Sequence, residues 1–214
     1  MFISEESRAR FCVRIWSTIR KFILGLMRVL WQRCFGLKKA LIIYWSATGN
    51  TEKVAFALRD GLDEGGLDVT TLKIRGSEEL DYFDYDLVCL GFPCHHFHPP
   101  EIVARFLKDR FDKYQKDGRI LPCSPTVLGK SALIVCTYSG PHSGIDEAIP
   151  AVKYTGQFFV HIWIPVVGEW YVIGEFHGRE DLSTKGKLGD IRGRPTEENL
   201  MQVRSDARAL AMRI

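Results

Sequence analysis

Six consecutive residues, Ser46-Ala47-Thr48-Gly49-Asn50-Thr51, form the segment of this 214-residue chain whose chemistry is clearest. They lie between an apolar run and a helical pattern, so their backbone N–H groups open a helix. Three hydroxyls, one amide side chain and the helix dipole can together hold a phosphate dianion there. The segment contains no lysine, unlike a nucleoside-triphosphate loop, and it does not match the G-x-G-x-x-G dinucleotide turn. It therefore predicts a phosphate monoester site, with an ordinary helix cap as the alternative.

A second group of reactive side chains follows another apolar run, within residues 91–100. Its members are a thiol, three histidines and an aromatic ring, contributed by Cys94, His95, His96, Phe97 and His98. Three histidines within four residues suggest a metal site, but no carboxylate or cysteine pattern completes a ligand set. A redox-active Cys94 thiol is a further alternative. We expect no metal here and leave the roles of the histidines open.

A third polar segment, residues 137–144, follows the next apolar run. It reads Thr-Tyr-Ser-Gly-Pro-His-Ser-Gly, and its small residues allow the backbone to approach a flat ligand closely. Tyr138 offers an aromatic ring, and His142 offers a hydrogen-bond donor or is simply a solvated loop residue. The segment therefore predicts a second wall for a planar ligand.

The three segments need a scaffold, and the rest of the chain alternates strand and helix patterns. We expect strands at 40–45, 67–74, 87–92, 131–137 and 158–167, and helices at 52–64, from Pro99-Pro100 to about Lys113, at 144–154, and from the cap Thr196 to about Met212. Residues 115–130 form a polar connection. Buried strands that are each followed by a helix favour a parallel sheet covered on both faces.

This pattern predicts a doubly wound α/β domain with a five-stranded parallel sheet in three layers. In such sheets ligands bind beyond the carboxyl ends of the strands. The loops after the first, third and fourth strands should therefore converge on one crevice.

The first segment resembles, position for position, the S/T-x-T-G-N-T phosphate loop of the flavodoxin family, whose members bind flavin mononucleotide (FMN). Gly91 to Pro100 is similar to the family's loop beside the isoalloxazine ring, and residues 137–144 resemble its flavin-edge loop. Many flavodoxins stack a Tyr or Trp on the ring, and none stands in the second loop here, so Tyr138 is the best substitute. The resemblance implies non-covalent FMN binding by Ser46, Ala47, Thr48, Gly49, Asn50, Thr51, Pro93, Cys94, His95, His96, Phe97, Thr137, Tyr138, Ser139, Gly140 and Gly144.

The stretch Asp190–Leu200 is similar to the R-x-P-S/T-E-x-E-L segment of flavodoxin-like NAD(P)H:quinone oxidoreductases. Before it lies an excursion containing Trp170, Tyr171, Phe176 and His177, which we expect to shape acceptor access. The resemblance implies an electron-transfer protein with a redox partner protein or a small-molecule acceptor. The alternative is an NAD(P)H-dependent quinone or flavin reductase, and a flavin-free interaction module is a third class.

Charge separates the chain into a basic arm and a mildly acidic body. Residues 1–39 hold nine basic and two acidic residues, a net charge of +7, whereas the rest holds 20 basic and 24 acidic residues, a net charge of −4. Classical carriers are strongly acidic, so the weak charge of the body slightly disfavours a carrier. We expect two domains, an N-terminal extension at 1–38 and the flavodoxin-like domain at 39–214.

Residues 8–37 have the pattern of a basic amphipathic helix. The longest uncharged stretch, Phe22–Met27, has six residues, far short of the roughly twenty that span a bilayer. The helix is expected either to bind a membrane surface peripherally or to pack its apolar face on the body or on a second copy, giving a homodimer. We expect no nucleic-acid partner.

Composition places the chain among ordinary globular proteins, with 46% hydrophobic and 26% charged residues, and excludes collagen-like and fully disordered classes. The six cysteines form no C-x-x-C pair, which favours reduced thiols in the cytoplasm and excludes an iron–sulfur ligand run. A cytoplasmic protein, with contact to the inner face of a membrane through the arm, is the expectation.

Overall fold

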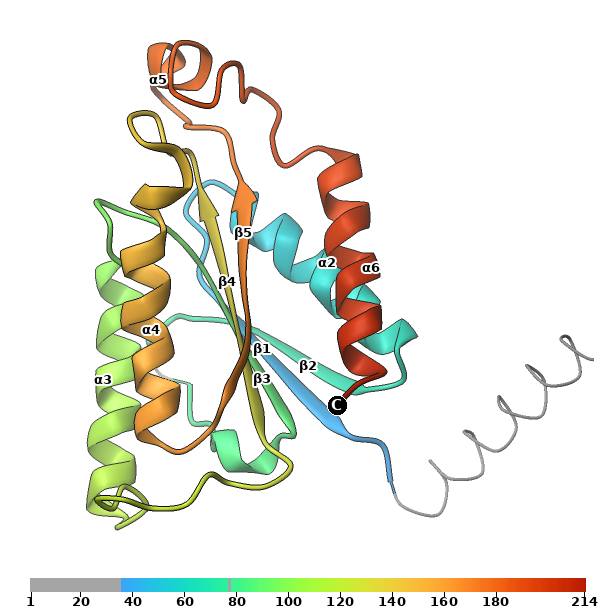
Figure 1. The fold of residues 1–214 in the computed structure, drawn as a ribbon, viewed down its shortest axis with the longest axis vertical. Helices are drawn as coiled ribbons and strands as arrows, with labels where there is room; N and C mark the ends of the chain where they lie inside the picture. Colours follow the sequence, from blue (N-terminus) through green and yellow to red (C-terminus); the bar gives the residue numbers. More distant parts are fainter. Residues whose placement is uncertain (1–35, 77) are drawn as a thin grey trace, which may run out of the picture. The chain divides into compact units, whose positions relative to one another are not determined.

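A computed structural model describes residues 36–76 and 78–214 and shows a five-stranded parallel sheet (Figure 1). The strands are β1 (Lys39–Tyr44), β2 (Asp68–Lys73), β3 (Leu87–Pro93), β4 (Ser131–Tyr138) and β5 (Val166–Ile173), in the order β2-β1-β3-β4-β5. The order reverses direction between β1 and β3, which is where doubly wound sheets bind ligands. The predicted fold class is thus confirmed for the domain, while the predicted amphipathic helix at 8–37 lies outside the described residues.

Helices cover both faces of the sheet (Figure 1). One core contains Leu41, Ile43 and Leu90 together with side chains of α3 (Glu101–Lys116) and α4 (Ile149–His161). The other contains Ile42 and Cys89 together with side chains of α2 (Asn50–Glu64) and α6 (Glu197–Ala211). Successive strand residues therefore enter opposite cores, which explains why the central strands are apolar throughout.

The fifth strand was predicted wrongly, because the apolar run 158–167 belongs mostly to a helix. We expected a helix ending near Tyr154 and a strand at 158–167, but α4 continues to His161 and β5 begins only at Val166. Buried residues of α4 recur at helical spacing, at 151, 152, 155, 156, 158 and 159. The chain then reverses at Trp163, whose φ is 64°. Trp170 and Tyr171, placed by our expectation in the following excursion, lie on β5.

The end of the chain follows the prediction more closely. Thr196 caps α6: its Oγ1 accepts a hydrogen bond from the Asn199 N–H at 3.3 Å, and its own backbone N–H donates to the Asn199 Oδ1 at 3.1 Å. A short helix, α5 (Glu180–Thr184), lies in the connection between β5 and α6. The polar connection predicted at 115–130 begins two residues later, because α3 extends to Lys116, and residues 117–130 contain no helix or strand. Lys38–Ile214 forms one compact unit.

Candidate anion and cofactor site

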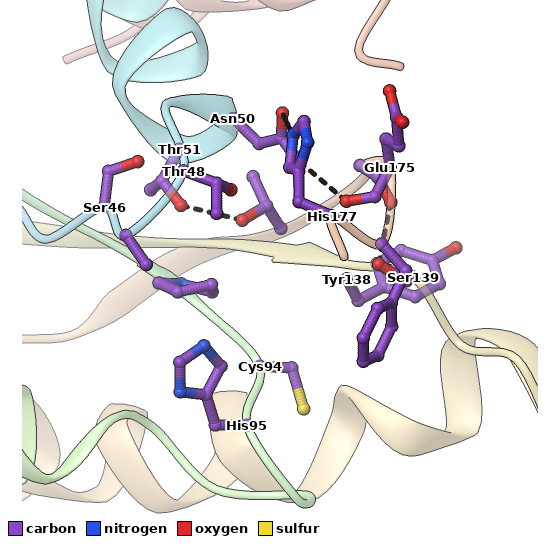
Figure 2. A pocket seen from close by; sticks show the side chains of 15 residues that line it. Ser46, Thr48, Asn50, Thr51, Cys94, His95, Tyr138, Ser139, Glu175 and His177 are labelled. Carbon is purple, nitrogen blue, oxygen red and sulfur yellow. Dashed lines mark hydrogen bonds between the residues drawn. The ribbon is translucent and has the colours of Figure 1, made fainter. Parts of the chain in front are cut away.

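The carboxyl ends of β1, β3, β4 and β5 surround a cavity of about 150 Å³ (Figure 2). Its walls come from four loops and contain Ser46, Ala47, Thr48, Asn50, Thr51, Pro93, Cys94, His95, Thr137, Tyr138, Ser139, Gly174, Glu175, Phe176 and His177. The three loops expected to converge do so. The fourth wall, from the loop after β5, adds four residues that we had not assigned to the site.

The first loop presents the start of α2 to this cavity. Gly49 has a φ of 98°, a conformation that glycine adopts without strain, and its N–H donates to the Ser46 Oγ at 3.1 Å. Within the described residues, no side chain caps α2, so the first-turn N–H groups of the helix have no capping side chain. Such uncapped N–H groups, at the positive end of a helix dipole, bind anions. Gly49 itself lies outside the cavity lining and acts through the shape of the turn.

Two hydroxyls fix this loop to the neighbouring strand. Thr51, which is 1% exposed, and Thr137, which is 2% exposed, share a hydrogen bond of 2.8 Å between their Oγ1 atoms. This bond joins the first turn of α2 to the end of β4, two segments 86 residues apart in sequence. It ties the turn at the start of α2 to the sheet.

The loop after β3 contributes Pro93, Cys94 and His95 to the cavity. The Cys94 N–H donates to the Thr137 carbonyl at 2.8 Å, and its Sγ donates to the Glu147 carbonyl at 3.1 Å. Burial raises the pKa of the Cys94 thiol, which keeps it protonated. A protonated, hydrogen-bonded thiol is a poor nucleophile, so this arrangement disfavours a redox-active Cys94.

Two residues predicted to touch the cofactor, His96 and Phe97, lie at the tip of a tight turn. His95 and His98 exchange two backbone hydrogen bonds of 2.9 Å, and between them His96 and Phe97 have φ values of 48° and 68°. Both are exposed and neither lines the cavity, Phe97 being 52% exposed. The alternation along this turn leaves only His95 at the cavity wall.

The histidines of this turn do not assemble a metal site. His95 packs edge-on against Trp45, with ring centroids 5.7 Å apart, and burial, followed by the nearby His96, lowers the pKa of its imidazole. His98 contacts the Tyr154 ring instead. Across residues 36–76 and 78–214, no group of three His, Cys, Asp or Glu side chains could hold a metal ion.

The loop after β4 lines the cavity with Thr137, Tyr138 and Ser139. Burial raises the pKa of Tyr138, so its ring carries a neutral hydroxyl. Gly140 and Gly144, both at positive φ, pack against each other rather than on the cavity, because the Gly144 N–H donates to the Gly140 carbonyl at 3.0 Å. These two glycines therefore determine the conformation of the loop without lining the cavity.

The loop after β5 forms the wall of the cavity next to the first loop, and the two loops are joined through Asn50. The Asn50 Nδ2 donates to the Glu175 carbonyl at 3.0 Å, and the Asn50 Oδ1 lies 3.4 Å from the His177 Nε2 (Figure 2). The Ser139 Oγ donates to the Gly174 carbonyl at 2.8 Å. The misplaced boundary of β5 hid this wall. The close packing requires glycine at position 174, because a Cβ there would lie 2.8 Å from the Asn50 Nδ2.

A charged group on α2 supports the first loop from outside the cavity. The Glu52 Oε1 accepts hydrogen bonds from the Tyr44 hydroxyl at 2.8 Å and from the Lys73 Nζ at 3.1 Å, and these bonds, that of Tyr44 first, lower the pKa of Glu52. Burial and the Glu52 hydrogen bond raise the pKa of Tyr44 to about 12. The tyrosine therefore stays a donor throughout the neutral range.

We expect this pair to make the stability of the domain depend on pH. A carboxylate whose pKa is lower in the folded state contributes stability above its unfolded pKa, and that stability is lost as the pH falls through the folded pKa. Urea unfolding at pH 7 and pH 3 should show a smaller acid-induced loss for Glu52→Gln than for the original protein. Equal losses in the two proteins would show that Glu52 contributes nothing to the pH dependence.

Fold and site together define a doubly wound α/β protein in which an uncapped helix start lies at the topological switch point. The family model described as Flavodoxin matches residues 42–140, which contain all three predicted loops apart from the end of the last. The chain is 40% identical over 50 residues to a flavodoxin of Clostridium beijerinckii, a match that covers 23% of this chain. That match spans 36% of the length of the relative.

Longer matches extend the likeness over most of the domain. An NAD(P)H dehydrogenase (quinone) of Archaeoglobus fulgidus is 23% identical over 190 residues, covering 72% of this chain and 94% of that protein. A solved flavodoxin structure from Streptococcus pneumoniae TIGR4 aligns with a TM-score of 0.56 at 22% identity, covering 82% of this chain and 99% of that one. The family model and the shared fold confirm the resemblance to the flavodoxin-like family seen in the loops of this chain.

Proposed function

We propose that this flavodoxin-like protein binds FMN non-covalently at the four-loop cavity and transfers electrons. The observation that carries the proposal is the uncapped start of α2, which opens into the cavity between hydroxyl side chains. A phosphate dianion bound there is stabilised by backbone N–H groups and by the helix dipole without a metal ion. FMN carries such a phosphate, and its ring supplies the redox chemistry.

The residues around the cavity fit this cofactor. Ser46, Thr48 and the first-turn N–H groups of α2 are the donors for the phosphate, while Tyr138 and the backbone around Cys94 are the candidates for contact with the ring. The cavity volume of about 150 Å³ is less than the roughly 300–1,000 Å³ typical of a ligand pocket. This size suits a ligand that buries its phosphate end and leaves part of its ring at the mouth, where an electron donor or acceptor can approach.

The first activity that we propose is electron transfer to or from a redox partner. The protein's role is to seat the ring and tune its potential through hydrogen bonds, stacking and nearby charge. No arginine or lysine belongs to the described cavity wall, and the Tyr138 phenol and the partly buried Cys94 thiol at the wall are neutral. We expect these neutral surroundings to disfavour a negatively charged reduced ring and so to lower the reduction potential.

An NAD(P)H:acceptor reductase is the second candidate, favoured by the likeness to the Archaeoglobus fulgidus NAD(P)H dehydrogenase (quinone) along most of the domain. Steady-state oxidation of NADH and NADPH with a quinone separates the two. A carrier gives no turnover above that of an equal concentration of free FMN, whereas a reductase saturates with both substrates. If the protein oxidises NADH or NADPH faster than free FMN does, the proposed function becomes that of a reductase and not of a carrier.

For the N-terminal arm we propose peripheral contact with an anionic membrane surface at its cytoplasmic face. The support is the net charge of +7 in residues 1–39 and the amphipathic pattern of residues 8–37. Among residues 36–76 and 78–214, no helix is long and apolar enough to cross a bilayer. Co-sedimentation with anionic liposomes should be lost when residues 1–38 are deleted. Unchanged co-sedimentation would refute the anchor, and loss of a dimer in light scattering would assign the arm to self-association instead.

A further inference from the structure

We propose that His177, on the loop after β5, is a ligand of the phosphate end of the cofactor. This inference rests on the proposed FMN site and extends it to a segment outside the three loops that define the family resemblance. His177 lines the cavity, and its Nε2 lies 3.4 Å from the Oδ1 of Asn50, the first residue of α2 (Figure 2). Its imidazole is therefore held beside the turn where the anion binds.

The charge of the cavity wall singles out this residue. The ionisable wall residues other than the neutral thiol and phenol are His95, Glu175 and His177, and none of the wall residues that the structure describes is Lys or Arg. The Glu175 Oε2 accepts a hydrogen bond from the Gly193 N–H at 2.8 Å, which ties the carboxylate to the segment before α6. His95 packs on Trp45, and burial lowers its pKa. His177 brings an imidazole, which can donate a hydrogen bond, to the start of α2.

The loop after β5 is also fixed in place without the cofactor. Asn50, which is 8% exposed, donates to the Glu175 carbonyl, and Ser139 donates to the Gly174 carbonyl at 2.8 Å. The Phe176 N–H donates to the Ser183 Oγ at 3.1 Å. The three residues before His177 are thus anchored, whereas its side chain is exposed at the cavity. A ligand group held on an anchored loop loses little entropy when the anion binds.

The test compares FMN with riboflavin, which lacks the phosphate. Dissociation constants of both ligands are measured by fluorescence quenching with the original apoprotein, His177→Ala, His177→Gln and the control His161→Ala. His161 is an exposed histidine at the end of α4 and lies outside the cavity wall. Since a hydrogen bond to a charged group is lost, we expect His177→Ala to weaken FMN binding about tenfold and riboflavin binding far less. His177→Gln, which keeps a donor, should recover part of the loss.

A second readout does not need FMN. The apoprotein is titrated with inorganic phosphate, and the imidazole resonances are followed by NMR, that of His177 being assigned by its loss in His177→Ala. A saturable shift of the His177 resonance, with none for His161, supports the inference. An unmoved His177 resonance, or equal losses of FMN and riboflavin affinity in His177→Ala, would overturn it. If the original protein binds no FMN, the proposed function fails and the phosphate titration alone decides about His177.

Discussion

Thr48→Glu should abolish most FMN binding while leaving the fold intact. Thr48 is exposed and lines the cavity beside the uncapped start of α2, so a glutamate there adds a negative charge where the phosphate dianion binds. At the effective dielectric constant of a protein surface, two like charges about 4 Å apart repel by several kcal/mol. We expect the affinity for FMN to fall by about 3 kcal/mol or more, which is roughly a hundredfold or greater loss.

The matched control is Thr70→Glu, which places the same new charge on an exposed threonine of β2 outside the cavity wall. FMN binding is measured by flavin fluorescence quenching, and thermal unfolding checks that both variants fold. Thr70→Glu should bind FMN almost as the original protein does. Equal affinities for all three proteins would show that the phosphate does not bind at this loop.

Gly61→Ala should cause the largest loss of stability among single-methyl changes in the helices. Gly61 lies where α2 packs on α6, and a Cβ at this position would collide with the Arg204 carbonyl and lie 2.7 Å from the Ala207 Cβ. The carbonyl belongs to the α6 backbone, so relief requires the two helices to separate. We expect the free energy of unfolding to fall by about 2 kcal/mol or more, because overpacking a close contact typically costs 1–3 kcal/mol.

A second helical glycine provides the control for this prediction. Gly156 lies in α4, and a Cβ there would meet its nearest neighbour, the Val166 Cγ2, at an ordinary distance of 3.8 Å. Gly156→Ala should therefore leave stability unchanged or raise it by up to about 1 kcal/mol through helix propensity. Urea unfolding of both variants gives the comparison. If Gly61→Ala were as stable as Gly156→Ala, the close packing of α2 on α6 would be wrong.

Much of the site was predictable because its first loop depends on local chemistry. The run from Ser46 to Thr51 combines hydroxyls, an amide and a glycine directly before a helix, and that combination has few uses besides capping and anion binding. The three central strands were predictable because each is apolar throughout and short. Parallel pairing then places their following loops at one edge of the sheet.

The boundary of β5 was not predictable from the same signals. Residues 158–167 form a continuous apolar run, which a buried helix end and a buried strand produce equally well. The turn that separates α4 from β5 is made at Trp163, a bulky residue at positive φ, where local preference favours glycine. Since β5 was placed too early, Gly174 and Glu175 were not assigned to the site, and Phe176 and His177 were expected only to shape acceptor access.

The turn after β3 illustrates a second limit. His96 and Phe97 both adopt positive φ, although neither residue type favours it, because the backbone of His95 and His98 closes the turn on both sides. A sequence pattern places all of these residues near the cofactor but does not tell which of them face it. The direction of each side chain depends on this non-local closure.

The visible absorption spectrum of the purified protein, with chromatographic identification of any released chromophore, tests the central claim most directly. We predict flavin absorption bands and the release of FMN, or the uptake of added FMN by a colourless preparation in a one-to-one ratio. A colourless protein that fails to bind added FMN would contradict the account and would mean that the loop at the start of α2 serves another ligand.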